Sequence, residues 1–298
     1  MGIEIQMTQK GVKPGQVATF TFKNQVQAYA LGIWAFRLSY GENVDHWVQD
    51  FSIKMLPTQT EDSSVAGNVV SVRVNARLQD SSGNTVNLDA ATVIYPVCVA
   101  MTGTYDSNTV MTNVGPITNG TSASVGLPGS SGFSAVVSFL SGFALDFSTA
   151  DHQVLGASAG CGITYNQSTG LISSSATLYD ADGNNANIAT VDVGVLASTD
   201  ANPGFAIKEV TSQTETGVNV IFPSGTPIRE VCCLIRSWQV EYDSVHNVRE
   251  FSIGTWGYPT ISGNTVTLPN LYAHIADSSG NQQNDLVSNA TVLVIAIP

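Results

Sequence analysis

The chain has 298 residues, of which 43% are hydrophobic and only 11% are charged, and its formal net charge at pH 7 is −12. Because no Lys or Arg occurs between Arg77 and Lys208, that stretch has no cation with which to bind phosphate, and we expect neither a nucleic-acid partner nor attraction to anionic lipid. The scarcity of Lys, Glu and Arg also disfavours helices, so the composition favours antiparallel β structure with polar outer faces.

The beginning of the chain, MGIEIQMTQK, has no apolar run behind a basic start, and no run of 18 apolar residues occurs anywhere. The sequence therefore predicts neither a secretory signal nor a transmembrane helix. The cysteines lack the spacing of a zinc site and are expected to be reduced: Cys98, Cys161, Cys232 and Cys233. We expect a soluble protein, cytoplasmic or exported without a classical signal, and the sequence leaves the compartment open.

The predicted strands, taken along the chain, have the two-residue period of half-buried β structure. In VSVRVNARL, residues 70–78, apolar and polar side chains alternate without a break. The same alternation occurs at 191–197 and at 292–296. Clusters of Gly, Asn and Ser separate these runs, which is typical of strands joined by short turns.

Four sequence markers recur three times at a spacing of about 100 residues. They are an aromatic residue at the start of a strand (Phe36, Phe143, Trp238), a His with Val two residues later (His46, His152, His246), an Asp-x-x-Gly-Asn turn (Asp80, Asp180, Asp277), and the tripeptide Ala-Thr-Val (91–93, 189–191, 290–292). The third copy has an additional residue before its turn and contains Pro269 there, which predicts a bulge or a sheet edge.

These markers predict an all-β fold of three tandem repeats of about 100 residues, each a small antiparallel β-sandwich. We place the repeats at 1–100, 128–200 and 217–298. The Ser/Thr/Asn-rich segment 101–127 has no clear period, and we expect a linker there, either an ordered surface excursion or a mobile tether. A second linker is expected at 201–216.

The recurring turn has two interpretations. As a hairpin connection, its Gly supplies a positive φ while its Asp and Asn bond local backbone groups. As a calcium site, the middle copy offers oxygen ligands from Asp180, Asp182 and Asn184, although calcium needs six to eight oxygens and no distant Glu follows. The other copies carry Ser in place of the second Asp. We favour the hairpin, and calcium is the only cofactor that we consider.

The three equivalent histidines, His46, His152 and His246, lack a catalytic setting in the sequence. Asp45 and Asp151 precede two of them, but no Ser nucleophile elbow is evident, and one His per repeat is too few for a metal site. We expect a structural imidazole bonded to a neighbouring backbone group. Because phosphate-binding and HExxH motifs are also missing from the sequence, we predict no enzyme activity and no catalytic residues.

The functional prediction is a non-enzymatic, lectin-like protein that binds a glycan or a cell surface through several repeats. A sugar needs polar partners and an aromatic ring on which to stack, and the candidate ligand-binding residues are Trp47, Tyr179, Trp256 and Tyr258. One alternative is a structural subunit of a self-assembling shell, fibre or virion, because low charge and β edges favour side-by-side assembly. A β-rich pore-forming or insecticidal toxin is another, and in each case a homo-oligomer is expected.

Overall fold

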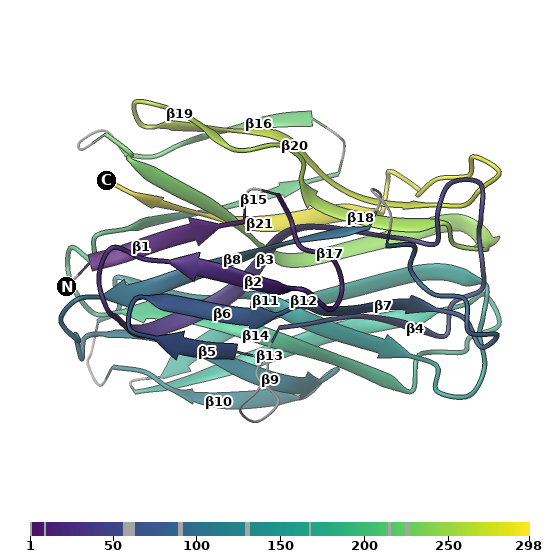
Figure 1. Ribbon diagram of the computed structural model, residues 1–298, viewed down its shortest axis with the longest axis horizontal. Helices are drawn as coiled ribbons and strands as arrows, with labels where there is room; N and C mark the ends of the chain where they lie inside the picture. Colours follow the sequence, from purple (N-terminus) through teal and green to yellow (C-terminus); the bar gives the residue numbers. More distant parts are fainter. Residues whose placement is uncertain are drawn as a thin grey trace.

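The computed structural model describes residues 2–8, 10–55, 63–88, 92–128, 132–166, 168–213, 216–223 and 227–298. Within these residues the protein has 21 β-strands and no helix, which confirms the predicted all-β class. The molecule is elongated along its strands, and both termini lie toward the same end (Figure 1).

The strands fall into three successive groups, which we call the first, second and third segments. The first segment contains β1 (Gly2–Met7), β2 (Val17–Thr21), β3 (Val26–Ser39), β4 (Asp50–Lys54), β5 (Ser63–Ala66), β6 (Val69–Arg73), β7 (Asn75–Gln79) and β8 (Val93–Thr102). The second contains β9 (Thr109–Thr118), β10 (Ser122–Gly126), β11 (Ala135–Asp146), β12 (Val154–Asn166), β13 (Thr169–Tyr179) and β14 (Ile188–Ser198). The third contains β15 (Ala206–Ser212), β16 (Thr216–Ile221), β17 (Glu230–His246), β18 (Glu250–Thr255), β19 (Thr260–Ser262), β20 (Thr265–Ala276) and β21 (Asn289–Ile297).

The same strand pairing occurs in all three segments. The third strand of each segment pairs antiparallel with the last one, in the pairs β3–β8, β11–β14 and β17–β21. The first strand adds to the other edge of that last strand, in the pairs β1–β8, β9–β14 and β15–β21. Two strands that come between the third and the last strand in the sequence form a further antiparallel pair, which is β4–β7, β12–β13 or β18–β20.

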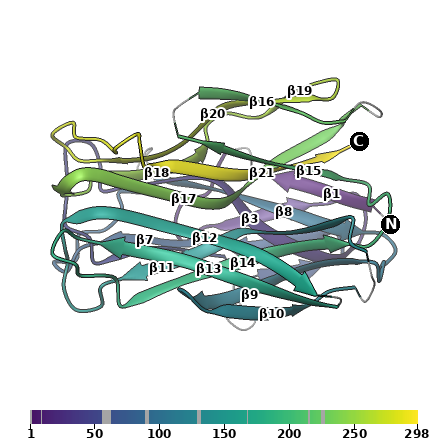
Figure 2. The ribbon, with the colours of Figure 1, turned by 180° about the vertical axis from the view of Figure 1, so that it is seen from behind.

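Strands of different segments also pair with one another, and these pairs close a ring around the molecule. β4 pairs with β11, β12 pairs with β17, and β18 pairs with β3. Each of the three large sheets therefore combines two segments, and we name each sheet by the strands that join them: the β3–β18, β4–β11 and β12–β17 sheets. Seen from behind, β12, β17 and β21 lie side by side in the last of these (Figure 2).

Three self-contained sandwiches are not confirmed, because the sheets mix strands of different segments. The β3–β18 sheet has the order β1-β8-β3-β18-β20-β16, with β19 also on β20. The other orders are β10-β13-β12-β17-β21-β15 and β7-β4-β11-β14-β9. A three-stranded sheet, β2-β6-β5, continues the β4–β11 sheet, because β6 and β7 are almost contiguous in the chain.

Both segments expected to be linkers contain strands. Residues 101–127 include β9 and β10, which pair with β14 and β13, and residues 201–216 include β15, which pairs with β21. The predicted bulge near Pro269 is also present, because the register of β16 on β20 shifts between Leu268 and Leu271. Side-chain alternation is weak in β9, which is why its sequence shows no clear period.

The aromatic markers of the three segments meet in the core. Their ring centroids lie 5.6 Å apart for Phe36 and Phe143, 6.0 Å for Phe36 and Trp238, and 5.4 Å for Phe143 and Trp238. Because these residues lie on β3, β11 and β17, the three large sheets face one another around a shared apolar core. We infer that the sheets stabilise one another, since each central strand packs on the other two.

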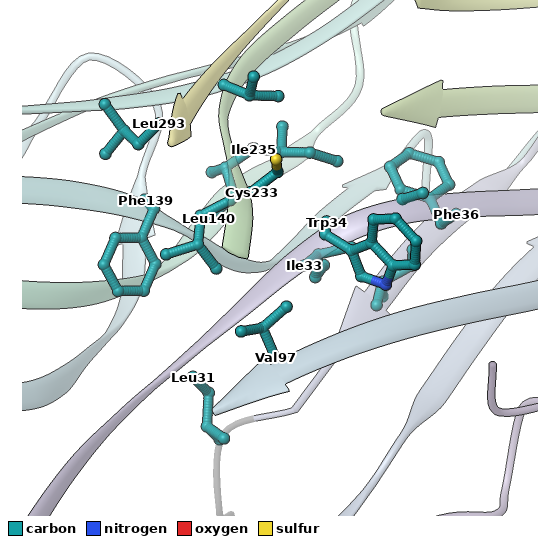
Figure 3. Packing of buried hydrophobic residues seen from close by; sticks show 14 of the residues in the cluster. Leu31, Ile33, Trp34, Phe36, Val97, Phe139, Leu140, Cys233, Ile235 and Leu293 are labelled. Atoms are coloured by element: carbon teal, nitrogen blue, oxygen red, sulfur yellow. The ribbon is translucent and has the colours of Figure 1, made fainter. Parts of the chain in front are cut away.

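Another layer of this core lies four residues earlier on the same strands. Gly32 of β3 leaves space that Phe139 of β11 and Leu234 of β17 fill, because a Cβ on Gly32 would lie 2.4 Å from Leu234 Cδ2 and 2.9 Å from Phe139 Cδ2. Figure 3 shows Phe139 among apolar side chains from other strands, including Leu293 of β21 and Leu31 of β3. The small residue on β3 thus makes room for large side chains from the other two central strands.

Candidate functional site

The three Asp-x-x-Gly-Asn turns have the same hydrogen-bond geometry. In the first turn, Asp80 Oδ1 accepts hydrogen bonds from the backbone N–H groups of Ser82 and Asn84 at 2.9 and 2.8 Å, and Oδ2 accepts one from the Asn84 amide at 2.6 Å. Asp180 and Asp277 accept the equivalent bonds within their own turns. The carboxylate therefore organises the loop between two strands.

Each turn carboxylate also contacts the histidine of its own segment. Nδ1 lies 3.2, 2.8 and 3.3 Å from the carboxylate Oδ2 in the pairs His46–Asp80, His152–Asp180 and His246–Asp277. Each imidazole packs on a ring, in the pairs Tyr40–His46, Phe147–His152 and Tyr242–His246. We expected a backbone partner for the imidazole; the turn instead places its carboxylate there, and we assign the pair a structural role.

The end of the molecule that holds the His–Asp pairs also joins each segment to the next. Backbone bridges connect Val48 with His152, Val154 with His246, and Val248 with His46. The residue before the histidine adds a polar contact in two of these junctions. Asp45 Oδ2 accepts hydrogen bonds from the Ser278 backbone and hydroxyl at 3.0 and 2.7 Å, and Asp151 Oδ2 accepts one from the Ser81 N–H at 3.3 Å. At the third junction the residue before the histidine is Val245, and the residue after the turn aspartate is Ala181. Both are apolar.

Two of the three candidate calcium ligands are engaged within the turn. Asp180 uses both oxygens to accept hydrogen bonds from the turn, and it contacts His152, while the Asn184 amide donates to Asp180 at 2.7 Å. The Asp182 side chain is exposed. In the part of the chain that the structure describes, no group of three or more His, Cys, Asp or Glu side chains is arranged to hold a metal. The geometry favours the hairpin interpretation.

The aspartates divide into two groups with opposite pKa shifts. Burial alone would raise the pKa of the Asp80 carboxyl, but hydrogen bonds from Asn84 and Ser82 together with the charge of His46 outweigh it and lower the pKa. The pKa values of Asp180 and Asp277 are lowered in the same way. Burial instead raises the pKa of Asp192, on β14, to about 6, against the attraction of Lys54.

These shifts predict a stability maximum at mildly acidic pH. The raised pKa of Asp192 contributes stability that is fully present below about pH 4, the usual carboxyl range, and is lost as the pH rises through the folded-state value of about 6. The lowered pKa values of the turn aspartates contribute stability that is present above about pH 4 and is lost as the pH falls further.

We therefore expect the urea midpoint to rise from pH 7 to about pH 4.5 and to fall below pH 4. The variant Asp192→Asn should lose the rise and keep the acid decline. A midpoint that stays flat between pH 7 and pH 5 in the unmodified protein would contradict the assignment to Asp192.

The outer faces of the three sheets differ at equivalent positions. β3, β11 and β17 each have a β-bulge at the same place, where the additional residue is Trp34, Ser141 or Arg236. Beside each bulge, paired residues on neighbouring strands point away from the core and form a row across the sheet. The rows are Tyr272, Gly254 and Tyr95 in the β3–β18 sheet, Asn75, Lys54 and Asp192 in the β4–β11 sheet, and Ser175, Gly160 and Thr291 in the β12–β17 sheet. The shared core thus carries three chemically different faces.

Five aromatic side chains gather on the outer face of the β3–β18 sheet, and we call this cluster the aromatic face. Ring centroids lie 5.1 Å apart for Trp34 and Tyr95, 5.2 Å for Trp34 and Tyr258, 5.9 Å for Tyr95 and Trp256, and 6.4 Å for Trp256 and Tyr272. Tyr258 is 43% exposed, whereas Trp34 is buried beneath it. The cluster therefore presents a supported ring to solvent.

A polar pocket of about 460 Å³ lies farther along the same sheet. At its base is Glu250, a buried carboxylate. The Arg37 Nε lies 3.1 Å from its Oε2, and both Arg249 Nη2 and His274 Nε2 lie 3.7 Å from its Oε1. The His274 ring is 6.3 Å from that of Tyr272, so His274 lies between Glu250 and the aromatic face.

The structure brings together two of the four predicted ligand-binding residues. Trp256 and Tyr258 belong to the aromatic face, where they lie between β18 and β19. Trp47 is 47% exposed at the end of the molecule that holds the His–Asp pairs, and Tyr179 lies on the β12–β17 sheet, where its hydroxyl donates to Glu241 at 2.9 Å. These two residues do not join the cluster.

Sequence reasoning missed Trp34, Tyr95 and Tyr272, as well as the two arginines of the pocket. Trp34 and Tyr95 occur in apolar runs that look like ordinary core strands, and only the pairing of β3 with β8 and β18 brings them together. The Ala-Thr-Val marker aligns Tyr95 with Val193 and Val294, whereas strand pairing places it with Asp192 and Thr291, so a comparison of the copies in sequence would not have indicated it.

No protein-family model matches this chain, and no curated protein matches it significantly. The described part of the chain also has no helix with the length and apolar character needed to span a membrane.

Proposed function

We propose that the protein is a carbohydrate-binding recognition protein whose ligand lies on the aromatic face of the β3–β18 sheet. The observation that carries this proposal is the exposed ring of Tyr258 supported from below by Trp34, with charged and hydroxyl groups close by on the same sheet. An aromatic ring offers a flat apolar surface to the C–H face of a sugar, and fixed polar groups beside it orient the hydroxyls.

Hydrogen bonds hold the Tyr258 ring and its loop in place before any ligand binds. The Tyr258 hydroxyl donates to the Thr8 carbonyl at 3.0 Å, which ties the loop to the beginning of the chain. The backbone N–H of Trp256 donates to the Asn270 carbonyl at 2.8 Å, which ties the loop to β20. A preformed ring loses little freedom on binding, so even modest contacts yield measurable affinity.

We also infer that the three segments are copies of one unit whose strands have been exchanged between neighbours. The recurring pairs, bulges and turns support this, while the outer faces differ. The copies share the core but differ in their outward rows. We therefore favour a single binding face, the aromatic one, over three identical faces. The multivalence that the sequence suggested would then come from oligomers of the chain, which we also propose.

Replacing Tyr258 with alanine should abolish or strongly weaken glycan binding without unfolding the protein. The ring is exposed, so its loss removes the stacking surface but little of the core. We expect at least a tenfold loss of affinity on a glycan array, followed by calorimetry with the strongest binder. Tyr165→Ala is the matched control, because Tyr165 is a similarly exposed tyrosine on β12. Equal losses in both variants, or no glycan binding by the unmodified protein, would refute the proposal.

A further inference from the structure

We propose that the glycan bound by this protein is acidic and that its carboxylate occupies the pocket formed by Arg37 and Arg249. This inference rests on the proposed function and names the ligand class of the same face. The protein has a net charge of −12, yet two of its few arginines line one pocket beside the aromatic face. Such a convergence of cations in an acidic protein needs an explanation beyond general solubility.

Three accessible charged side chains line this pocket, of which Arg37 and Arg249 are positive and Glu42 is negative. The side chains of Arg37 and Arg249 are 39% and 28% exposed, whereas that of Glu250 is only 7% exposed. The carboxylate therefore lies beneath the guanidinium groups and holds them in position. Glu42 is exposed on the loop after β3, where water and salt screen its charge, as they also screen that of Arg37.

The guanidinium groups retain donors for a ligand. A guanidinium has five N–H donors, and Arg37 directs Nε and Nη2 to one oxygen of Glu250. The Nε of Arg249 is buried and has no hydrogen-bond partner among the residues that the structure describes. Because this Nε is shielded from solvent, contact with a ligand would come from the outer nitrogens of the two guanidinium groups, and a carboxylate is the acceptor that matches an arginine best.

The spacing of the pocket and the aromatic face suits a ligand longer than a single sugar. Glu250 and Gly254 lie on the same side of β18, four residues apart, which corresponds to about 13 Å along a strand. Ser252 lies between them, opposite Arg37 on β3 and His274 on β20. A sugar stacked on Tyr258 would therefore be joined to an acidic sugar at the pocket, with hydroxyl and imidazole groups beneath the linkage.

The test compares matched probes that differ only in their acid group. Sialyllactose and oligogalacturonate are each compared with the corresponding methyl ester, by calorimetry at low and high salt. We expect at least tenfold tighter binding of an acidic probe than of its neutral counterpart, and a smaller difference at high salt. Arg249→Gln should remove most of that preference and leave neutral binding in place, while Tyr258→Ala should weaken both.

The control variant is Arg77→Gln, which removes an exposed arginine from the outer face of the β4–β11 sheet and should leave the preference unchanged. If acidic and neutral probes bind equally and Tyr258→Ala still weakens both, the inference is overturned and the proposed function stands. An acidic preference that survives Arg249→Gln would also overturn it. If no probe binds and the glycan array is blank, both the inference and the proposed function fail.

Discussion

Replacing Phe51 with alanine is expected to lower the free energy of unfolding by about 3–5 kcal/mol, the usual cost of deleting a buried phenylalanine ring. Phe51 is fully buried on β4, and its ring contacts the rings of Phe36, Phe143, Trp238 and Phe251 at centroid distances between 4.0 and 6.2 Å. These partners come from all three segments. The cavity would therefore weaken every sheet of the shared core at once.

The measurement is equilibrium unfolding in urea, and the loss should appear as a lower midpoint in one cooperative transition. Phe133→Ala is the matched control, because Phe133 is only half-buried and contacts Tyr165 near the edge of the core. Its loss should cost much less. A similar small cost in both variants would show that the three segments do not share a core, and a split into separate transitions would favour three independent units.

The sequence predicted the β-strands and the repetition, but it did not predict which strands are neighbours. Alternation in residues 70–78 shows which side chains face the core, and Val70, Val72 and Leu78 are indeed buried. Alternation contains no information on whether β4 joins its own segment or β11 of the next. That choice depends on packing among Phe36, Phe143 and Trp238, which lie about 100 residues apart in the chain.

The candidate site was predicted only where its residues are close together in the sequence. Trp256 and Tyr258 stand in a Gly/Pro-containing break after β18, which marks a loop. Arg37 and Arg249 are separated by most of the chain, and they meet because β18 closes the ring of segments against β3. Sites that form at such closures depend on the topology, so a prediction of separate sandwiches places these arginines on different domains.

Replacing Gly254 with alanine is expected to destabilise the protein by about 1–3 kcal/mol through backbone strain, and by about 1–3 kcal/mol more through overpacking. Gly254 has a φ of +114°, which L-residues rarely adopt. A Cβ there would lie 2.3 Å from the carbonyl oxygen of Trp34 and 2.6 Å from the Cα of Ala35. Because both atoms belong to the backbone of β3, the neighbouring strand itself must move.

Two control glycines separate these causes. Gly83→Ala has a φ of +91° but no atom within 4 Å of the new Cβ, so it should show strain alone, and Gly126→Ala has neither feature and should be nearly neutral. In urea unfolding, the loss in free energy of unfolding should be largest for Gly254→Ala, smaller for Gly83→Ala and smallest for Gly126→Ala. Since the displaced strand carries Trp34, the support of Tyr258, only Gly254→Ala should also lose glycan binding at temperatures where it remains folded. Retained binding with a displaced β3 would show that Trp34 does not position the ring of Tyr258.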